Sequence, residues 1–150
     1  LGGKRTYKKN MGLMSMSYGY VYVASVALGA DRMQTLKAFQ EAEAYDGPSI
    51  IFAYAPCIAH GIDMSKTQTE QKRAVEAGYF PLYRYNPANE QPFTWDSKDP
   101  KENFQDFIRS EGRYKSLLKT NPEAAEALYA QAESDAQKRM NVYKSVGELM

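Results

Sequence analysis

Two short apolar segments, separated by a helix-like segment, constrain the fold of this chain most. Residues 20–26 are rich in β-branched and aromatic residues, and residues 49–54 form a second, continuous apolar run. Asp31 can cap a helix between them. The apolar residues of that helix recur every three to four positions: Met33, Leu36, Ala38 and Ala42. A strand, a helix and a strand in this order predict a βαβ unit with two parallel strands. We expect both faces of the second strand to be covered, because a continuous apolar run is typical of strands inside a parallel sheet.

The segments on either side of this unit are expected to be mainly helical. Before it, residues 11–16 predict a short helix that stops at Gly19. After residue 63 the chain is more polar, and we expect a helix over 67–77 closed by Gly78 and then an extended aromatic segment over 79–87. An irregular polar connection over 89–100 should follow. The chain should end with one or two amphipathic helices interrupted near Gly112 and a last helix from Pro122, with Asn121 as its cap. The predicted fold class is therefore α/β, a βαβ piece of a parallel sheet followed by a mostly helical C-terminal region.

Composition excludes several classes of function. The 19 Lys and Arg residues nearly balance the 18 Asp and Glu residues, and a net charge of +1 argues against a nucleic-acid or membrane-surface binder. The longest apolar stretch, residues 20–30, is shorter than the roughly 20 residues that span a bilayer. We expect no membrane segment and a cytoplasmic setting. The start at Leu1 suggests a piece of a longer polypeptide, and the basic run over residues 4–9 is interpreted as a solvated tail rather than a phosphate-binding arm.

The single cysteine, Cys57, is the main candidate for chemistry. Alone it forms no internal disulfide, and it provides only one of the about four ligands that a zinc or iron–sulfur site needs. It follows the second predicted strand directly, and ligands of open parallel sheets bind beyond the carboxyl ends of the strands. His60, three positions later, could activate it as a nucleophile, but a lone cysteine after an apolar strand is more often a small buried hydrophobic residue. No glycine-rich phosphate loop is present, and we expect Glu41 and Glu43 to be solvated.

Several strings in fixed order closely resemble the pyruvate:ferredoxin (flavodoxin) oxidoreductase family. They are GLMSMSYGYVYVA (12–24), QTLKAF (34–39), EAEAYDGPS (41–49), AYAPCIAHG (53–61) and EAGYFPLYRYNP (76–87). The resemblance is to the carboxyl-terminal part of the thiamine-diphosphate-binding domain. It implies that residues 1–62 are the C-terminal portion of that α/β domain, and that residues 63–150 are an extended arm and helical region of the same domain.

The resemblance also implies a function. Enzymes of this family oxidatively decarboxylate pyruvate with coenzyme A to acetyl-CoA and CO2, and pass electrons through 4Fe–4S clusters to ferredoxin or flavodoxin. Cys57 matches the cysteine that supplies the fourth ligand of the cluster nearest the thiamine, while three cysteines elsewhere supply the others. His60 would then tune this cluster from outside its ligand shell. The motifs for thiamine diphosphate and Mg²⁺ would lie before Leu1, so the isolated chain should be inactive.

Two alternatives remain open at this point. One is a related 2-oxoacid:ferredoxin oxidoreductase with another substrate. The other is a non-catalytic interaction module, in which the helices between Phe104 and Met150 serve subunit packing. The resemblance implies the remaining domains of a parent enzyme as partners, and a homodimer at full length.

Overall fold

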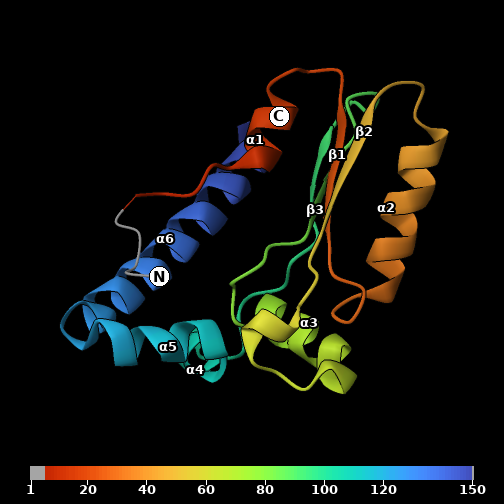
Figure 1. Cartoon of the computed structure of the whole chain (residues 1–150). Helices are drawn as coiled ribbons and strands as arrows, with labels where there is room; N and C mark the ends of the chain where they lie inside the picture. Colours follow the sequence, from red (N-terminus) through yellow and green to blue (C-terminus); the bar gives the residue numbers. More distant parts are fainter. Residues whose placement is uncertain (1–5, 150) are drawn as a thin grey trace.

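A four-stranded mixed sheet separates two helical layers (Figure 1). The computed structural model of the chain describes residues 6–149, without the side chains of residues 60 and 149, so the predictions on Leu1 and on the first part of the basic run lie outside the described residues. Helix α2 covers one face of the sheet, and α1 and α6 lie on the other. The strands follow the order β2-β1-β3-β4, and their bounds are Tyr22–Val26 (β1), Ser49–Ala53 (β2), Tyr83–Tyr85 (β3) and Phe93–Trp95 (β4).

The βαβ unit is present as the sequence predicts. Strands β1 and β2 pair in parallel, with Tyr22 opposite Ser49 and Val26 opposite Ala53. The intervening helix α2 spans Arg32–Ala44, and the Asp31 side chain accepts a hydrogen bond from the Gln34 amide at 2.9 Å. This cap satisfies one of the amide groups that the first turn of a helix leaves without a partner. The predicted α/β class is confirmed.

The strand that is covered on both faces is β1, not β2. Every residue of β1 is buried, whereas Ser49, Ile50 and Ala53 of β2 are exposed. The expectation for β2 was wrong because local apolarity does not reveal where a strand lies in the sheet. Among the described residues no strand pairs with the outer edge of β2, so β2 ends the sheet on that side.

The other half of the sheet is antiparallel. Strand β3 lies within the aromatic segment expected to be extended, and it pairs antiparallel with β1. Strand β4 lies in the segment expected to be irregular, and Trp95 of β4 lies opposite Tyr83 of β3. The expectation for residues 89–100 was therefore partly wrong. Three residues carry little local signal, and pairing with β3 decides their conformation.

The helices agree closely with the sequence-based expectations. Their bounds are Met11–Met16 (α1), Thr67–Glu76 (α3), Phe104–Ser110 (α4), Gly112–Thr120 (α5) and Pro122–Leu149 (α6), with short 3₁₀ turns at Ile58–His60 (η1) and Met64–Lys66 (η2). Gly19, with φ of +76°, and Gly78, with φ of +70°, follow α1 and α3 in the left-handed conformation that favours glycine.

Helix α6 contributes to two separate clusters of buried side chains. Near its start, Ala125 and Tyr129 pack with α3, α4 and α5 around Phe107. Near its end, Tyr143 packs against the sheet, where its ring stacks on that of Tyr83 with centroids 4.4 Å apart. The first cluster lies at the end of the sheet where the carboxyl ends of β1 and β2 meet α3 (Figure 1).

Candidate functional site

Cys57 lies on the loop that leaves the carboxyl end of β2, as predicted. The Tyr54 amide donates to the Val26 carbonyl at 3.0 Å, and this bond extends the pairing with β1 by one residue beyond β2. Pro56 is buried, whereas the Cys57 thiol is exposed. The interpretation of Cys57 as a small buried hydrophobic residue was therefore wrong. Pro56 is anchored in the protein while the next side chain faces outward, so the loop presents the thiol at the carboxyl edge of the parallel strands.

Gln71 of α3 holds the start of this loop. Its side-chain amide donates to the Tyr54 carbonyl at 2.8 Å, and its carbonyl accepts a hydrogen bond from the Gly29 amide at 2.6 Å. Gly29 belongs to the connection after β1, so one side chain joins the segments that leave both parallel strands. The backbones of Gly29 and Gln68 also approach closely, because a Cβ added to Gly29 would come within 2.2 Å of the Gln68 carbonyl oxygen. Helix α3 therefore packs directly on the carboxyl edge of β1.

The beginning of α5 holds the end of the loop. Gly61 has φ of +65°, and a Cβ added to it would lie 2.9 Å from the Gly112 Cα. Beside this contact, the Tyr54 hydroxyl donates to Glu111 at 3.3 Å. Residues 55–60 are thus held at both ends by the helical cluster.

Glu111 is fully buried and organises a polar network beneath the loop. Arg113 donates to its carboxylate at 2.7 Å and also to the Tyr79 hydroxyl at 2.9 Å, which lies 3.3 Å from that of Tyr114. Burial raises the pKa values of Tyr54 and Tyr114 well above their ordinary range, so both hydroxyls keep their protons at neutral pH. The network thus consists of the Arg113–Glu111 ion pair and neutral tyrosine hydroxyls that bond to it or to one another.

The side chains described by the structure do not form a complete metal site. No three His, Cys, Asp or Glu side chains among them gather where they could hold a metal ion. The structure describes the backbone of His60 in η1 but not its side chain, so the pairing of Cys57 with His60 stays a prediction. The sequence did not single out Gln71 or Glu111, because Gln71 lies on a polar helix, Glu111 lies between two helices, and neither belongs to a motif.

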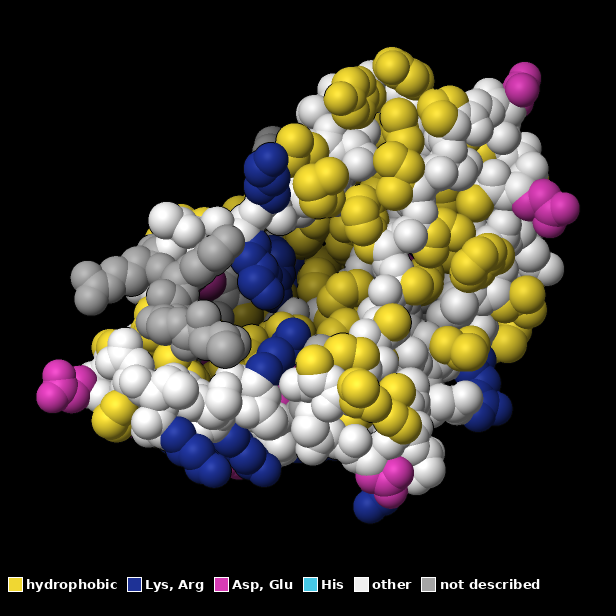
Figure 2. Space-filling model, in the orientation of Figure 1, with side chains coloured by type: hydrophobic (Ala, Val, Ile, Leu, Met, Phe, Trp, Pro, Cys, Tyr) yellow, Lys and Arg dark blue, Asp and Glu magenta, His cyan; other side chains and the backbone are white. Residues whose placement is uncertain are grey.

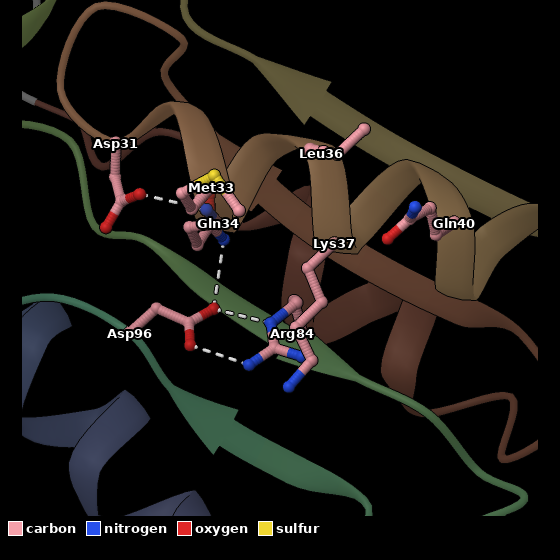
Figure 3. Close-up of a pocket in the computed structure, with 8 residues that line it drawn as sticks. All are labelled: Asp31, Met33, Gln34, Leu36, Lys37, Gln40, Arg84 and Asp96. Atoms are coloured by element: carbon pink, nitrogen blue, oxygen red, sulfur yellow. Dashed lines mark hydrogen bonds and ion pairs between the residues drawn. The ribbon is translucent and has the colours of Figure 1, made fainter.

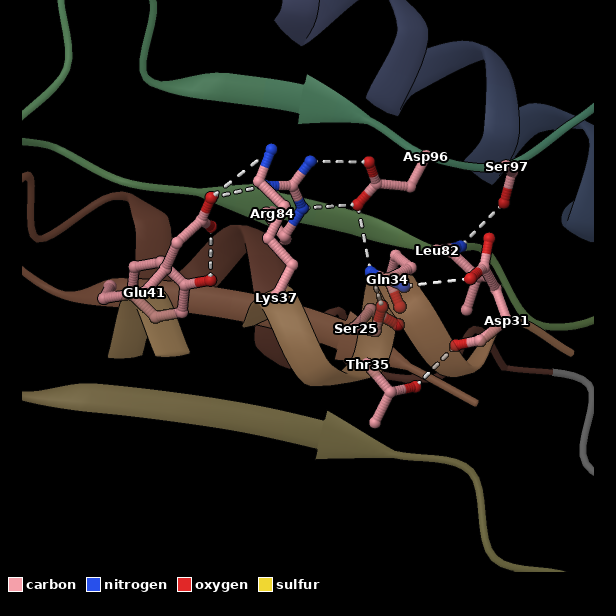
Figure 4. A network of polar contacts seen from close by, with 11 residues as sticks. Ser25, Asp31, Gln34, Thr35, Lys37, Glu41, Leu82, Arg84, Asp96 and Ser97 are labelled. Carbon is pink, nitrogen blue, oxygen red and sulfur yellow. Dashed lines mark hydrogen bonds and ion pairs between the residues drawn. The ribbon is translucent and has the colours of Figure 1, made fainter. Parts of the chain in front are cut away.

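Apart from the Cys57 loop, a hollow of about 400 Å³ lies between α2 and the β3–β4 half of the sheet (Figure 3). Arg84 forms two hydrogen bonds with Asp96 there, of 2.8 and 2.9 Å, and a third with Glu41 at 2.5 Å (Figure 4). Gln34 and Tyr22 donate to these same carboxylates, each at 2.9 Å.

These contacts give the hollow a structural role. Glu41 was expected to be solvated, and that expectation was wrong because Arg84, 43 positions away, pairs with it, whereas Glu43 is exposed as expected. The hydrogen bonds to Asp96 raise the pKa of the Arg84 guanidinium, which stays charged. Arg84 pairs with both Asp96 and Glu41, so the network ties α2 to β3.

Helices of the described chain do not include a membrane span. None of them is at once long enough and apolar enough to cross a bilayer within residues 6–149. Hydrophobic side chains do gather on the side of the molecule that carries β2 and α2 (Figure 2). On α2, the side chains of Met33, Leu36 and Phe39 are at least half exposed.

Comparison with known proteins relates the chain to a segment of much longer oxidoreductases. No protein-family model matches the chain. It is 60% identical, over 98% of its residues, to the pyruvate:ferredoxin oxidoreductase of Moorella thermoacetica. The chain is a homologue of one segment of such oxidoreductases. A pyruvate-flavodoxin oxidoreductase of Enterobacter agglomerans is 54% identical over 95% of the chain, and the mitochondrial pyruvate dehydrogenase [NADP(+)] of Euglena gracilis is 46% identical over 99%.

The resemblance seen in the sequence strings is thereby confirmed. The chain spans 13% of the length of the Moorella and Enterobacter oxidoreductases and 8% of the Euglena protein. Most of each relative consequently lies outside the segment to which this chain corresponds.

Proposed function

We propose that this chain is part of an oxidoreductase that oxidatively decarboxylates pyruvate with coenzyme A and passes the electrons through 4Fe–4S clusters to ferredoxin or flavodoxin. The names of all three relatives contain pyruvate, which favours pyruvate over other 2-oxoacids as the substrate. The acceptors in those names differ: ferredoxin, flavodoxin and NADP(+).

Within this proposal, Cys57 supplies one thiolate to a 4Fe–4S cluster. The observation that carries the assignment is an exposed thiol on a loop held at both ends, at the carboxyl edge where ligands of parallel sheets bind. The chain has a single cysteine, so the other three thiolates come from outside this segment. A cluster held in this way would supply an electron-transfer centre.

The remaining parts of the proposal concern the parent protein. Residues 1–62 belong to the C-terminal portion of its thiamine-diphosphate-binding domain, and residues 63–150 form an arm and helical region of that domain. Thiamine diphosphate and Mg²⁺ are bound by other parts of the parent, which works in the cytoplasm as a homodimer. The 150-residue chain by itself has no activity.

Replacing Cys57 with alanine in the full-length parent enzyme tests the assignment. We expect the electron paramagnetic resonance signal of one reduced 4Fe–4S cluster to disappear, and pyruvate-dependent reduction of ferredoxin or flavodoxin to be lost. The matched control is Ile58→Ala, which truncates the neighbouring side chain, itself 81% exposed, and should retain both. If Cys57→Ala keeps every cluster and the full rate of electron transfer, the ligand assignment is wrong.

Assaying the same parent enzyme with pyruvate and with bulkier 2-oxoacids tests the substrate. A higher kcat/KM for pyruvate is expected. A preference for a bulkier oxoacid would favour the related oxidoreductase of other specificity.

A further inference from the structure

We infer that Gln71 is a positioning residue that sets where Cys57 lies relative to the carboxyl ends of β1 and β2. This inference rests on the proposed function, because it assumes that Cys57 ligates a cluster. It goes beyond that function by assigning a role to a side chain on a different element, α3. Gln71 is not itself a cluster ligand.

The first step is the geometry of the Gln71 side chain. Its amide donates to the Tyr54 carbonyl at 2.8 Å, while its carbonyl accepts from the Gly29 amide at 2.6 Å. A primary amide is suited to this position because it combines a donor group and an acceptor oxygen at the end of one side chain. These two bonds continue the connection between β1 and β2 beyond the last backbone bond, from the Tyr54 amide to the Val26 carbonyl.

The second step is that α3 has a fixed position against the sheet. The Gln68 backbone, one turn before Gln71, lies so close to Gly29 that no Cβ fits between them. Because α3 is held against the β1 connection in this way, the Gln71 side chain extends from a rigid base. It therefore defines the direction in which the chain leaves Tyr54.

The third step connects Tyr54 to the thiol. Only Ala55 and Pro56 separate Tyr54 from Cys57. Pro56 is buried and its ring fixes φ near −65°, so this short connection has little freedom to absorb a change at Tyr54. A shift of the Tyr54 carbonyl is consequently passed on to Cys57 and to any group bound to it.

The test uses two variants of the full-length parent enzyme. Gln71→Glu retains the acceptor for Gly29 and loses the donor to Tyr54, and Gln71→Met loses both at a similar volume. Since Gln71 is only partly buried, both variants retain the packing of α3. The matched control is Gln68→Met, the same substitution one turn earlier, where the side chain is exposed and bonds only the exposed Arg32 in the described structure.

We expect both Gln71 variants to change the reduction potential and the paramagnetic resonance line shape of the cluster that requires Cys57. Substituting a group that orients a metal ligand typically costs about 10–100-fold in activity, and we expect a loss of kcat in this range with KM for pyruvate unchanged. A purely structural role would leave the potential and line shape of the assembled cluster unaltered. The inference is overturned if potential, line shape and kcat in both variants equal those of Gln68→Met.

A parallel Cys57→Ala variant separates the two hypotheses. If that variant keeps all clusters, the proposed ligand is wrong. If it loses one cluster while the Gln71 variants behave like Gln68→Met, only the positioning role of Gln71 is refuted.

Discussion

Replacing Arg84 with methionine is expected to destabilise the chain strongly, because Arg84 is the centre of a nearly buried ion network. Its side chain is 9% exposed, and its main partner, Asp96, is 12% exposed. Removing one partner of a buried ion pair costs about 3–5 kcal/mol. Asp96 keeps its hydrogen bond from Gln34, and Glu41 keeps that from Tyr22, so we expect the lower end, about 3 kcal/mol. For a chain of this length, that corresponds to a fall in Tm of about 6–12 °C.

Urea unfolding of the 150-residue chain, followed by circular dichroism, measures this change. The midpoint should fall while the dependence of the unfolding free energy on urea stays the same. Lys37→Met is the control, because Lys37 approaches the same Glu41 carboxylate at 4.0 Å but is 61% exposed, and its loss should cost less than about 0.5 kcal/mol.

A double variant extends this test. Arg84→Met combined with Asp96→Asn should cost less than the sum of the two single changes, because the second removes the carboxylate that the first leaves buried. The reasoning is refuted if Arg84→Met is no more destabilising than Lys37→Met, or if the two changes simply add.

Two further predictions concern packing and pH. Gly29→Ala should lower the unfolding free energy by about 3 kcal/mol, because its Cβ would meet the Gln68 backbone, whereas Gly19→Ala meets nothing within 4 Å and should cost about 1 kcal/mol through its positive φ. Equal values in urea unfolding would contradict this reading of the Gly29 contact. Burial raises the pKa values of Tyr54 and Tyr83 in the folded chain, so their contribution to stability is present at neutral pH and is lost as the pH rises above about 10, where unfolded tyrosine ionises. In an alkaline titration their tyrosinate absorbance should appear together with the loss of circular dichroism; ionisation of all tyrosines in a still folded chain would be inconsistent with this.

Local signals predicted the elements that depend on local chemistry. Asp31 caps α2, Pro122 begins α6, and Gly19 follows α1 as expected. The parallel βαβ unit was also predictable, because strand and helix periodicities alternate within one short stretch. The location of Cys57 beyond β2 followed from the same pattern.

Features that depend on distant partners could not be predicted in this way. Strand β4 exists because β3 lies beside it, and the ion pair of Glu41 depends on Arg84, 43 positions away. The two bonds of Gln71 join segments that lie 17 and 42 positions away, and an isolated glutamine on a polar helix gives no sign of them. The edge position of β2 likewise depends on which strands flank it and not on its own apolar residues.

The contact between Asn10 and Tyr143 has a consequence for the order of events during synthesis. The Tyr143 hydroxyl donates to the Asn10 side chain at 2.6 Å across 133 positions, and the Tyr143 ring stacks on Tyr83. On the ribosome, α1 and the sheet face beside it therefore lack the contact with Tyr143 until that residue has emerged. Because contacts of such large sequence separation form late, the apolar side chains of that face, such as Val23 and Tyr85, stay accessible to chaperones for most of the time in which the described chain is made.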